Sequence, residues 1–191
     1  VFACQLAQDS ELHQKKLTGE KILEVKLDGV RVITVLYPNG KVDMFSRNGK
    51  ELTNFNSLQE ELKEKIRIKT LDEAIVIDGE VVSKNFQELM KQIHRKEVIQ
   101  NQDATLFLFD FLPFEKFKDG IYKKTYKLRT LNLKNWYDRF IKNSDKIKLI
   151  EKKIINLDCS EGLSVFRNFN NESIVQGCLL YTSDAADDVI S

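Results

Sequence analysis

A lysine flanked by two carboxylates lies near the start of the chain, in the stretch Glu24-Val25-Lys26-Leu27-Asp28-Gly29-Val30-Arg31. Residues 22–27 alternate like a strand, which places Glu24 and Lys26 on one face, and Asp28-Gly29 then indicates a turn. A lysine amine attacks only when neutral, so its pKa of about 10.4 must be lowered by desolvation or by a nearby cation such as Arg31. These residue types suit a lysine nucleophile, although Lys-x-Asp-Gly alone more often marks a surface lysine beside a turn.

Two further polar positions follow at strand ends. Arg47 ends the second strand of a hairpin turned by Pro38-Asn39-Gly40, and a guanidinium there suits an anionic or ribose ligand. Glu80 shares one face with Asp78 on a strand predicted over residues 74–82. Carboxylates at the end of an apolar strand need water, a cation or a hydroxyl group as a partner. A solvent-exposed turn is the alternative for both positions.

Residues 104–112 form an almost unbroken apolar run, which predicts a buried strand. Alternation places Phe107, Phe109 and Phe111 on one face of it. An aromatic platform suits a nucleobase because every base has a π-face. Three core phenylalanines are the alternative, and this alternative is favoured for Phe107 and Phe111.

Together these positions resemble the motifs of the covalent nucleotidyltransferases, which include ATP-dependent DNA ligases, RNA ligases and mRNA capping enzymes. Lys26-Leu27-Asp28-Gly29-Val30-Arg31 resembles the nucleophile motif Lys-x-Asp-Gly-x-Arg. Three later stretches resemble the family's next three motifs, in the family's order. They are Phe45-Ser46-Arg47-Asn48-Gly49, Ile77-Asp78-Gly79-Glu80-Val81-Val82 and Leu108-Phe109-Asp110-Phe111-Leu112. The resemblance is to the adenylylation domain of phage-type or bacterial ATP-dependent DNA ligases, with RNA ligase and capping enzyme as alternatives. In NAD-dependent ligases this motif resembles Lys-x-Asp-Gly-x-Ala. The arginine at position 31 therefore favours ATP over NAD as the cofactor.

The resemblance implies an α+β fold, with antiparallel sheets flanked by helices around a nucleotide cleft. Lys26 would attack the α-phosphate of ATP, form lysyl-AMP and release pyrophosphate, while Asp28 orients the lysine or the nick. Mg²⁺ would neutralise the charge that develops on the phosphates. In the intact parent, AMP would pass to the 5′-phosphate of a nick in double-stranded DNA, and the 3′-hydroxyl would displace it. Such enzymes act in DNA replication, repair and recombination.

The resemblance also implies nucleotide-binding roles for five side chains. Glu24 would contact the adenine edge, and Phe109 would stack on the purine. Arg31 and Arg47 would hold ribose and phosphate. Glu80 would contact the ribose and help to hold the metal.

The family pattern runs to Gly177, so residues 1–177 are interpreted as a partial adenylylation domain, without the family's OB-fold domain. The next motif, Glu-Gly with apolar residues and a lysine, does not follow Ser173–Gly177. Residues 178–191 resemble a translated sequencing adapter and are interpreted as a non-native tail, with a genuine acidic terminus as the alternative. Glu161-Gly162-Leu163 begins like the missing motif but lacks its lysine. The chain is therefore expected to self-adenylylate poorly and not to seal nicks, and an inactive binding remnant is the alternative.

Periodic patterns predict the remaining elements: helices over 57–67 (with Ser57 and Glu60 as a capping box), 86–93 and 160–169, and a strand over 147–157. Between Lys123 and Lys153, eleven Lys or Arg residues against three acids give a net charge of +8. Leu128, Leu131, Trp136 and Phe140 predict a helix in this segment that packs by its apolar side. Its basic face is a candidate for DNA phosphate contacts.

Length and composition limit the other possibilities. The 191 residues suit one domain, and a net charge of +1 gives no global attraction to nucleic acid. Cys4, Cys159 and Cys178 lack metal-ligand spacing, which favours a reducing compartment over zinc or disulfides. No apolar run approaches the roughly 18 residues of a membrane span, and no secretory leader is expected. A cytoplasmic monomer in a bacterial or phage-infected cell is expected.

Overall fold

The structure is a computed structural model that describes residues 18–67, 70–95, 98–172 and 178–182. The predictions for Ser173–Gly177 and for most of the tail lie outside the described residues. The elements in chain order are β1 (Glu20–Val25), β2 (Val30–Leu36), β3 (Val42–Ser46), α1 (Asn56–Arg67), β4 (Ile75–Val82), α2 (Phe86–His94), β5 (Thr105–Pro113), α3 (Phe114–Asp119), α4 (Tyr126–Phe140), β6 (Ile147–Leu149), β7 (Lys152–Asn156), α5 (Ser160–Glu172) and β8 (Cys178–Thr182).

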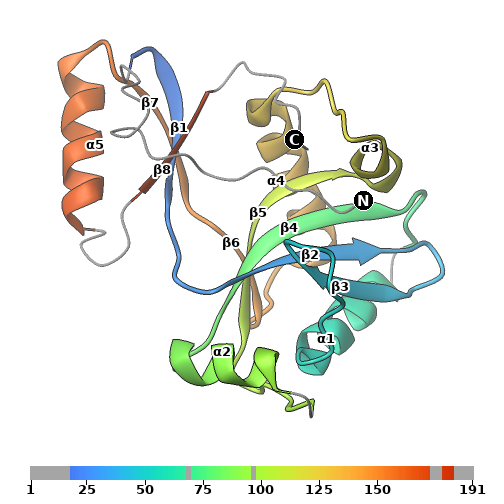
Figure 1. Ribbon diagram of the computed structural model, residues 1–191. Coiled ribbons are helices and arrows are strands. Elements are labelled where there is room, and N and C mark those ends of the chain that lie inside the picture. Colours follow the sequence, from blue (N-terminus) through green and yellow to red (C-terminus); the bar gives the residue numbers. More distant parts are fainter. Residues whose placement is uncertain (1–17, 68–69, 96–97, 173–177, 183–191) are drawn as a thin grey trace.

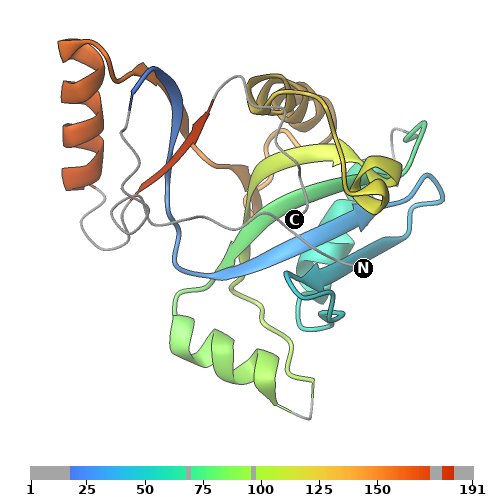
Figure 2. The ribbon, with the colours of Figure 1, turned by 45° about the horizontal axis from the view of Figure 1, so that its top comes forward.

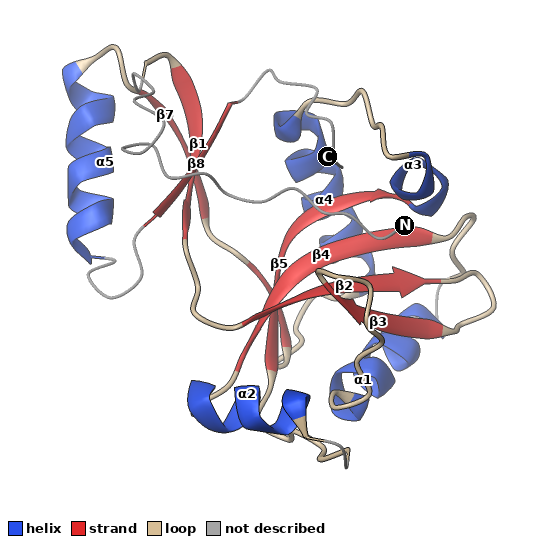
Figure 3. Ribbon diagram, viewed as in Figure 1, coloured by secondary structure: helices blue, strands red, loops and turns tan. Residues whose placement is uncertain are grey.

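The strands form two sheets with helices packed against them, so the predicted α+β class is confirmed (Figure 1, Figure 3). The larger sheet has the order β3-β2-β4-β5-β6, in which only the β5–β6 pair is parallel. The smaller sheet, β7-β1-β8, is antiparallel. In the described part of the chain, no helix is long and apolar enough to cross a membrane.

The two faces of the five-stranded sheet differ in what covers them. One face contributes Val32, Ile77 and Leu108 to a core shared with α1, α2 and α4. On the other face, Ile33 and Val35 belong to a second core that includes Phe117 of α3, Tyr122, Val76 and Leu112. The second core occupies one end of this face, and polar side chains occupy the end near the smaller sheet. This polar end carries most of the predicted site residues.

The chain passes between the sheets at two points that lie close together. Residues 26–29 join β1 to β2, and residues 150–151 join β6 to β7. Glu24 at the end of β1 lies opposite Lys152 at the start of β7. Figure 2 shows the chain leaving β1 in the smaller sheet and entering β2 in the larger one.

Three predicted element boundaries are wrong. The strand expected over residues 22–27 ends at Val25, because the chain turns towards the larger sheet there. The strand expected over 147–157 is two strands, since β6 pairs with β5 while β7 pairs with β1. The first helix begins at Asn56, and the Ser57 hydroxyl is buried without a partner among the described residues, so it does not cap.

The inward face of α4 also differs from the prediction. Trp136 and Phe140 are buried as expected, but Leu128 and Leu131 are 40% and 53% exposed. Arg129 turns inward instead and is 1% exposed, with its Nε 3.0 Å from Asp110 Oδ1. A charged side chain at an inward position obscured the periodicity.

Strand β8 pairs with the free edge of β1, so that Leu179 lies opposite Glu24. This segment is the start of the proposed non-native tail. Pairing uses backbone groups that every residue here supplies, so the strand does not distinguish a native segment from a foreign one. The origin of residues 178–191 stays a prediction.

Gly162→Ala is expected to destabilise the fold. A Cβ at this position of α5 would lie 1.8 Å from the Asn156 carbonyl oxygen, so the helix would have to move away from β7. Overpacking of this kind costs about 1–3 kcal/mol. Denaturant unfolding measures the loss, with Ser164→Ala on the exposed side of the same helix as the control. Equal stability of the two variants would contradict the close packing, which also explains the glycine in Glu161-Gly162-Leu163.

Candidate active site

A row of side chains crosses the polar end of the larger sheet. Arg31, Glu80 and Phe107 lie opposite one another on β2, β4 and β5. Val32 pairs with Ser46, so Arg47 leaves β3 beside this row, as an exposed residue in the turn that Gly49 closes. Strand pairing therefore gathers residues from three separate motifs, together with Phe107, which directly precedes the fourth.

Arg31 forms a two-point ion pair with Asp78. Its Nε donates to Asp78 Oδ1 at 3.0 Å and its terminal amine to Oδ2 at 2.6 Å. Burial raises the pKa of Asp78, although Arg31 opposes this effect. The guanidinium carbon also lies 5.2 Å from the centre of the Phe109 ring, a cation–π distance. Asp78 and Phe109 thus fix the plane of the Arg31 side chain.

A β-bulge at Phe109 corrects the prediction for the three phenylalanines. Asp78 pairs with Asp110 but Gly79 pairs with Leu108, so Phe109 is an extra residue in β5. An extra residue reverses the faces beyond it. Phe107 therefore shares the face of Glu80, whereas Phe111 packs with the main core and lies 5.9 Å from the ring of Trp136. The core alternative holds for Phe111.

The Asp28-Gly29 turn presses against β4. A Cβ at Gly29 would lie 2.2 Å from the Val81 carbonyl oxygen, so only glycine allows this approach. The Gly29 amide donates to Glu80. Burial raises the pKa of Glu80 to about 7, Arg31 opposes this, and the charges of Asp78 and Asp28 add to it.

Lys26 and Asp28 are both exposed and lie in the connection between the sheets. The lysine was predicted at the end of a strand; it is instead the first residue beyond β1. Because its flanks are anchored by β1 on one side and by the Gly29 contact on the other, its backbone is held while its side chain is accessible.

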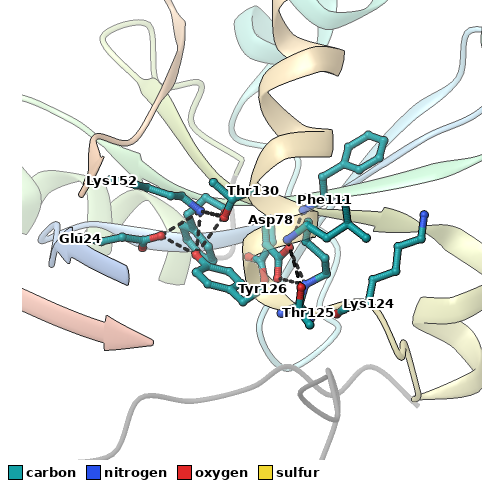
Figure 4. A network of polar contacts seen from close by, with 12 residues as sticks. Glu24, Asp78, Phe111, Lys124, Thr125, Tyr126, Thr130 and Lys152 are labelled. Atoms are coloured by element: carbon teal, nitrogen blue, oxygen red, sulfur yellow. Dashed lines mark hydrogen bonds and ion pairs between the residues drawn. The ribbon is translucent and has the colours of Figure 1, made fainter. Parts of the chain in front are cut away.

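Glu24 lies in a buried polar network (Figure 4). Its Oε1 accepts from the Tyr126 hydroxyl and lies 2.9 Å from Lys152 Nζ. The ammonium also donates to the Phe109 carbonyl, to the Tyr126 oxygen at 2.7 Å and to Thr130 Oγ1 at 3.2 Å. Burial raises the pKa of Glu24, while Lys152 and Tyr126 lower it.

Lys152 and Tyr126 were not predicted as site residues, because Lys152 lies in a basic run that is typical of a solvated surface. The alternation of side chains along the strand could have indicated that Lys152 points into the site. Ile155 and Leu157 alternate in a segment predicted as a strand, and alternation places Lys152 on the opposite face from Ile155. The partner on that face is set by the pairing with β1, which the sequence does not give.

The residues present fit a nucleotide with a bound Mg²⁺. Glu80 and Asp28 are neighbouring carboxylates at the exposed end of the site, and Mg²⁺ is commonly held by one or two carboxylates together with phosphates and water. Among the described residues, no group of three or more potential metal ligands occurs. A hollow of about 410 Å³ is lined by none of the predicted site residues; its lining is Lys116, Asp119, Ile121, Tyr122, Lys123 and Lys124.

The family model described as ATP dependent DNA ligase domain matches residues 3–178. The chain belongs to this family. It is 35% identical over 124 residues to a DNA ligase of Caldivirga maquilingensis (strain ATCC 700844 / DSM 13496 / JCM 10307 / IC-167), which covers 59% of this chain and 20% of that protein. The chain therefore spans only a fifth of the length of this ligase.

Solved ligase structures share the fold. The protein named Pmar-Lig_Pre superposes with a TM-score of 0.89 at 38% identity, over 96% of this chain and 43% of that one. The ATP-dependent DNA ligase from bacteriophage T7, in complex with ATP, gives a TM-score of 0.62 at 16% identity, over 90% and 57% of the two chains. The second likeness shows the fold alone. The expected nucleotidyltransferase fold of ATP-dependent DNA ligases is thus confirmed.

Glu80→Gln is expected to change how stability depends on pH. The carboxyl titrates near 4.5 in the unfolded chain and at about 7 in the folded protein, so the folded state binds the proton more tightly. The free energy of unfolding therefore falls as the pH rises between these values. The neutral glutamine avoids this loss, so the variant gains about 1–2 kcal/mol relative to wild type between about pH 4 and pH 8, after allowance for solvent screening.

Denaturant unfolding of wild type and Glu80→Gln at about pH 4 and at about pH 8 measures this gain. Glu64→Gln, which changes an exposed carboxylate on α1, is the matched control and should show no such gain. A constant stability difference between wild type and Glu80→Gln would contradict the raised pKa.

Proposed function

We propose that this chain provides the nucleophile and the nucleoside pocket of an ATP-dependent DNA ligase. Lys26 attacks the α-phosphate of ATP, a phosphoramidate bond forms between the lysine nitrogen and AMP, and pyrophosphate leaves. The observation that carries the proposal is the position of Lys26. It is an exposed lysine held between β1 and the Gly29–β4 contact, beside the row of Arg31, Glu80 and Phe107.

The side chains around Lys26 have complementary roles in this proposal. Glu24 accepts from the adenine edge, and the Phe109 ring stacks on the purine. Arg31, fixed by its ion pair and ring contact, and Arg47, at the adjacent turn, bind ribose and phosphate. Asp28 orients the lysine or the nick, and Glu80 contacts the ribose.

Bound Mg²⁺ would neutralise the charge that develops on the phosphates, with Glu80 as a ligand. A bound cation would also stabilise the ionised form of the Glu80 carboxyl, which burial disfavours. Removal of the metal with a chelator should therefore suppress transfer to Lys26.

In the intact protein, AMP is passed to the 5′-phosphate of a nick in double-stranded DNA and released when the 3′-hydroxyl attacks. Exposed lysines of α4, such as Lys127 and Lys134, which pair with Glu20 and Asp138 in the free protein, are candidates for phosphate contacts. A monomer acting in the cytoplasm, in replication, repair and recombination, is the setting we propose.

A nucleotide-binding role without efficient transfer is the second candidate. Strand β8, which borders β1, reads Cys-Leu-Leu-Tyr-Thr and supplies no cation. The family's corresponding motifs carry lysines that grip the α-phosphate, and loss of such charge stabilisation costs several kcal/mol of barrier. We therefore expect transfer to be slow.

Intact mass spectrometry after incubation with ATP and Mg²⁺ tests the proposal. Wild type should slowly gain one AMP adduct, and Lys26→Ala should gain none because the amine is gone. Lys50→Ala, which removes another exposed lysine from a turn, should keep the adduct. Binding of ATP without an adduct would replace the transferase by the binding role, and an adduct in Lys26→Ala would place the nucleophile elsewhere.

A further inference from the structure

The two carboxylate oxygens of Glu24 have different surroundings. Oε1 is satisfied by Tyr126 and Lys152, whereas Oε2 is buried and has no hydrogen-bond partner among the described residues. A buried acceptor without a donor is unfavourable. One oxygen therefore anchors the side chain, and the other can still accept a hydrogen bond.

The anchor of Glu24 is itself held by several elements. Lys152 is 10% exposed on its side chain and binds oxygens from β5 and α4. Tyr126 is 2% exposed, and its ring lies 4.4 Å from Lys152 Nζ and 5.2 Å from the guanidinium carbon of Arg129. Figure 4 shows Tyr126 and Lys152 converging on Glu24 from α4 and β7. These contacts hold the side chain in place and oppose the rise in the pKa of Glu24 that burial causes.

An ionised carboxylate accepts hydrogen bonds and never donates them, whereas a protonated one also donates. The 6-amino group of adenine is a donor, and the 6-carbonyl group of guanine is an acceptor. The protonation state of Glu24 therefore decides which purine edge fits against Oε2.

We propose that Lys152 and Tyr126 are positioning residues that hold Glu24 as an acceptor-only carboxylate, so that the pocket selects 6-amino purine nucleotides and rejects 6-carbonyl ones. The inference rests on the proposed function, in which Glu24 meets the base edge. It adds two residues that contact neither substrate nor metal. If the pair had a purely structural role, substituting either residue would weaken the binding of all nucleotides alike.

Removal of Lys152 has a specific chemical consequence. Without the ammonium, burial favours the protonated form of Glu24, which is already disfavoured as an anion by desolvation and by the nearby Asp110. A protonated carboxyl can donate to a 6-carbonyl group. ITP, which differs from ATP in having this carbonyl, should then bind more tightly than it does to wild type.

The test compares ATP and ITP on the whole chain, by calorimetric binding and by intact mass of the nucleotidyl adduct. In Lys152→Met, the ratio of ATP affinity to ITP affinity should fall by at least ~10-fold, and ITP affinity itself should rise. Tyr126→Phe should shift the ratio in the same direction by less, and it provides a second test if Lys152→Met does not fold. Lys153→Met, on the opposite face of the same strand, should leave the ratio unchanged.

The outcomes separate the two proposals. An unchanged ratio in both variants, or an equal loss for ATP and ITP, overturns the positioning role. Wild type that binds ATP and ITP equally overturns this inference while the ligase proposal stands. Wild type that binds neither nucleotide and forms no adduct overturns both.

Discussion

The pairing of Glu24 with Lys152 is the contact on which the geometry of the site depends. It fixes the register of β1 against β7 at the point where both chains pass between the sheets. A slip of one residue would turn Glu24 to the other face, among Leu163 and Phe166 of the apolar cluster under α5. Burial of an unpaired carboxylate is strongly unfavourable, so the ion pair permits one register and thereby fixes where Lys26 emerges.

A second constraint operates within the larger sheet. Asp78 and Asp110 lie directly opposite each other on β4 and β5, a placement that is unfavourable for like charges. Each carboxylate is compensated by its own arginine, Arg31 from β2 for Asp78 and Arg129 from α4 for Asp110. The two pairs join the sheet to its helix and to the nucleophile motif, and they leave Glu80 as the carboxylate of β4 that faces outward.

Motif order and most elements were readable from the sequence because turns, apolar periodicity and motif spacing are local, whereas the role of Lys26 as nucleophile stays a prediction. The errors have a common physical cause. The end of β1 at Val25, the bulge at Phe109 and the inward position of Arg129 are each decided by a partner far along the chain. The position of Lys152 was not predicted for the same reason, since it is set by the pairing of β7 with β1 and not by the basic residues that adjoin Lys152 in the sequence.

The placement of β1 between two late strands has a consequence for synthesis. Both of its partners, β7 and β8, lie beyond Glu151, whereas β2, β3, β4 and β5 can pair as soon as they leave the ribosome. Chains emerge from their amino terminus, and distant pairings form slowly. Strand β1 thus stays an unpaired apolar edge until nearly the whole described chain has emerged, and a nascent chain brings Glu24 against Lys152 only as a last step.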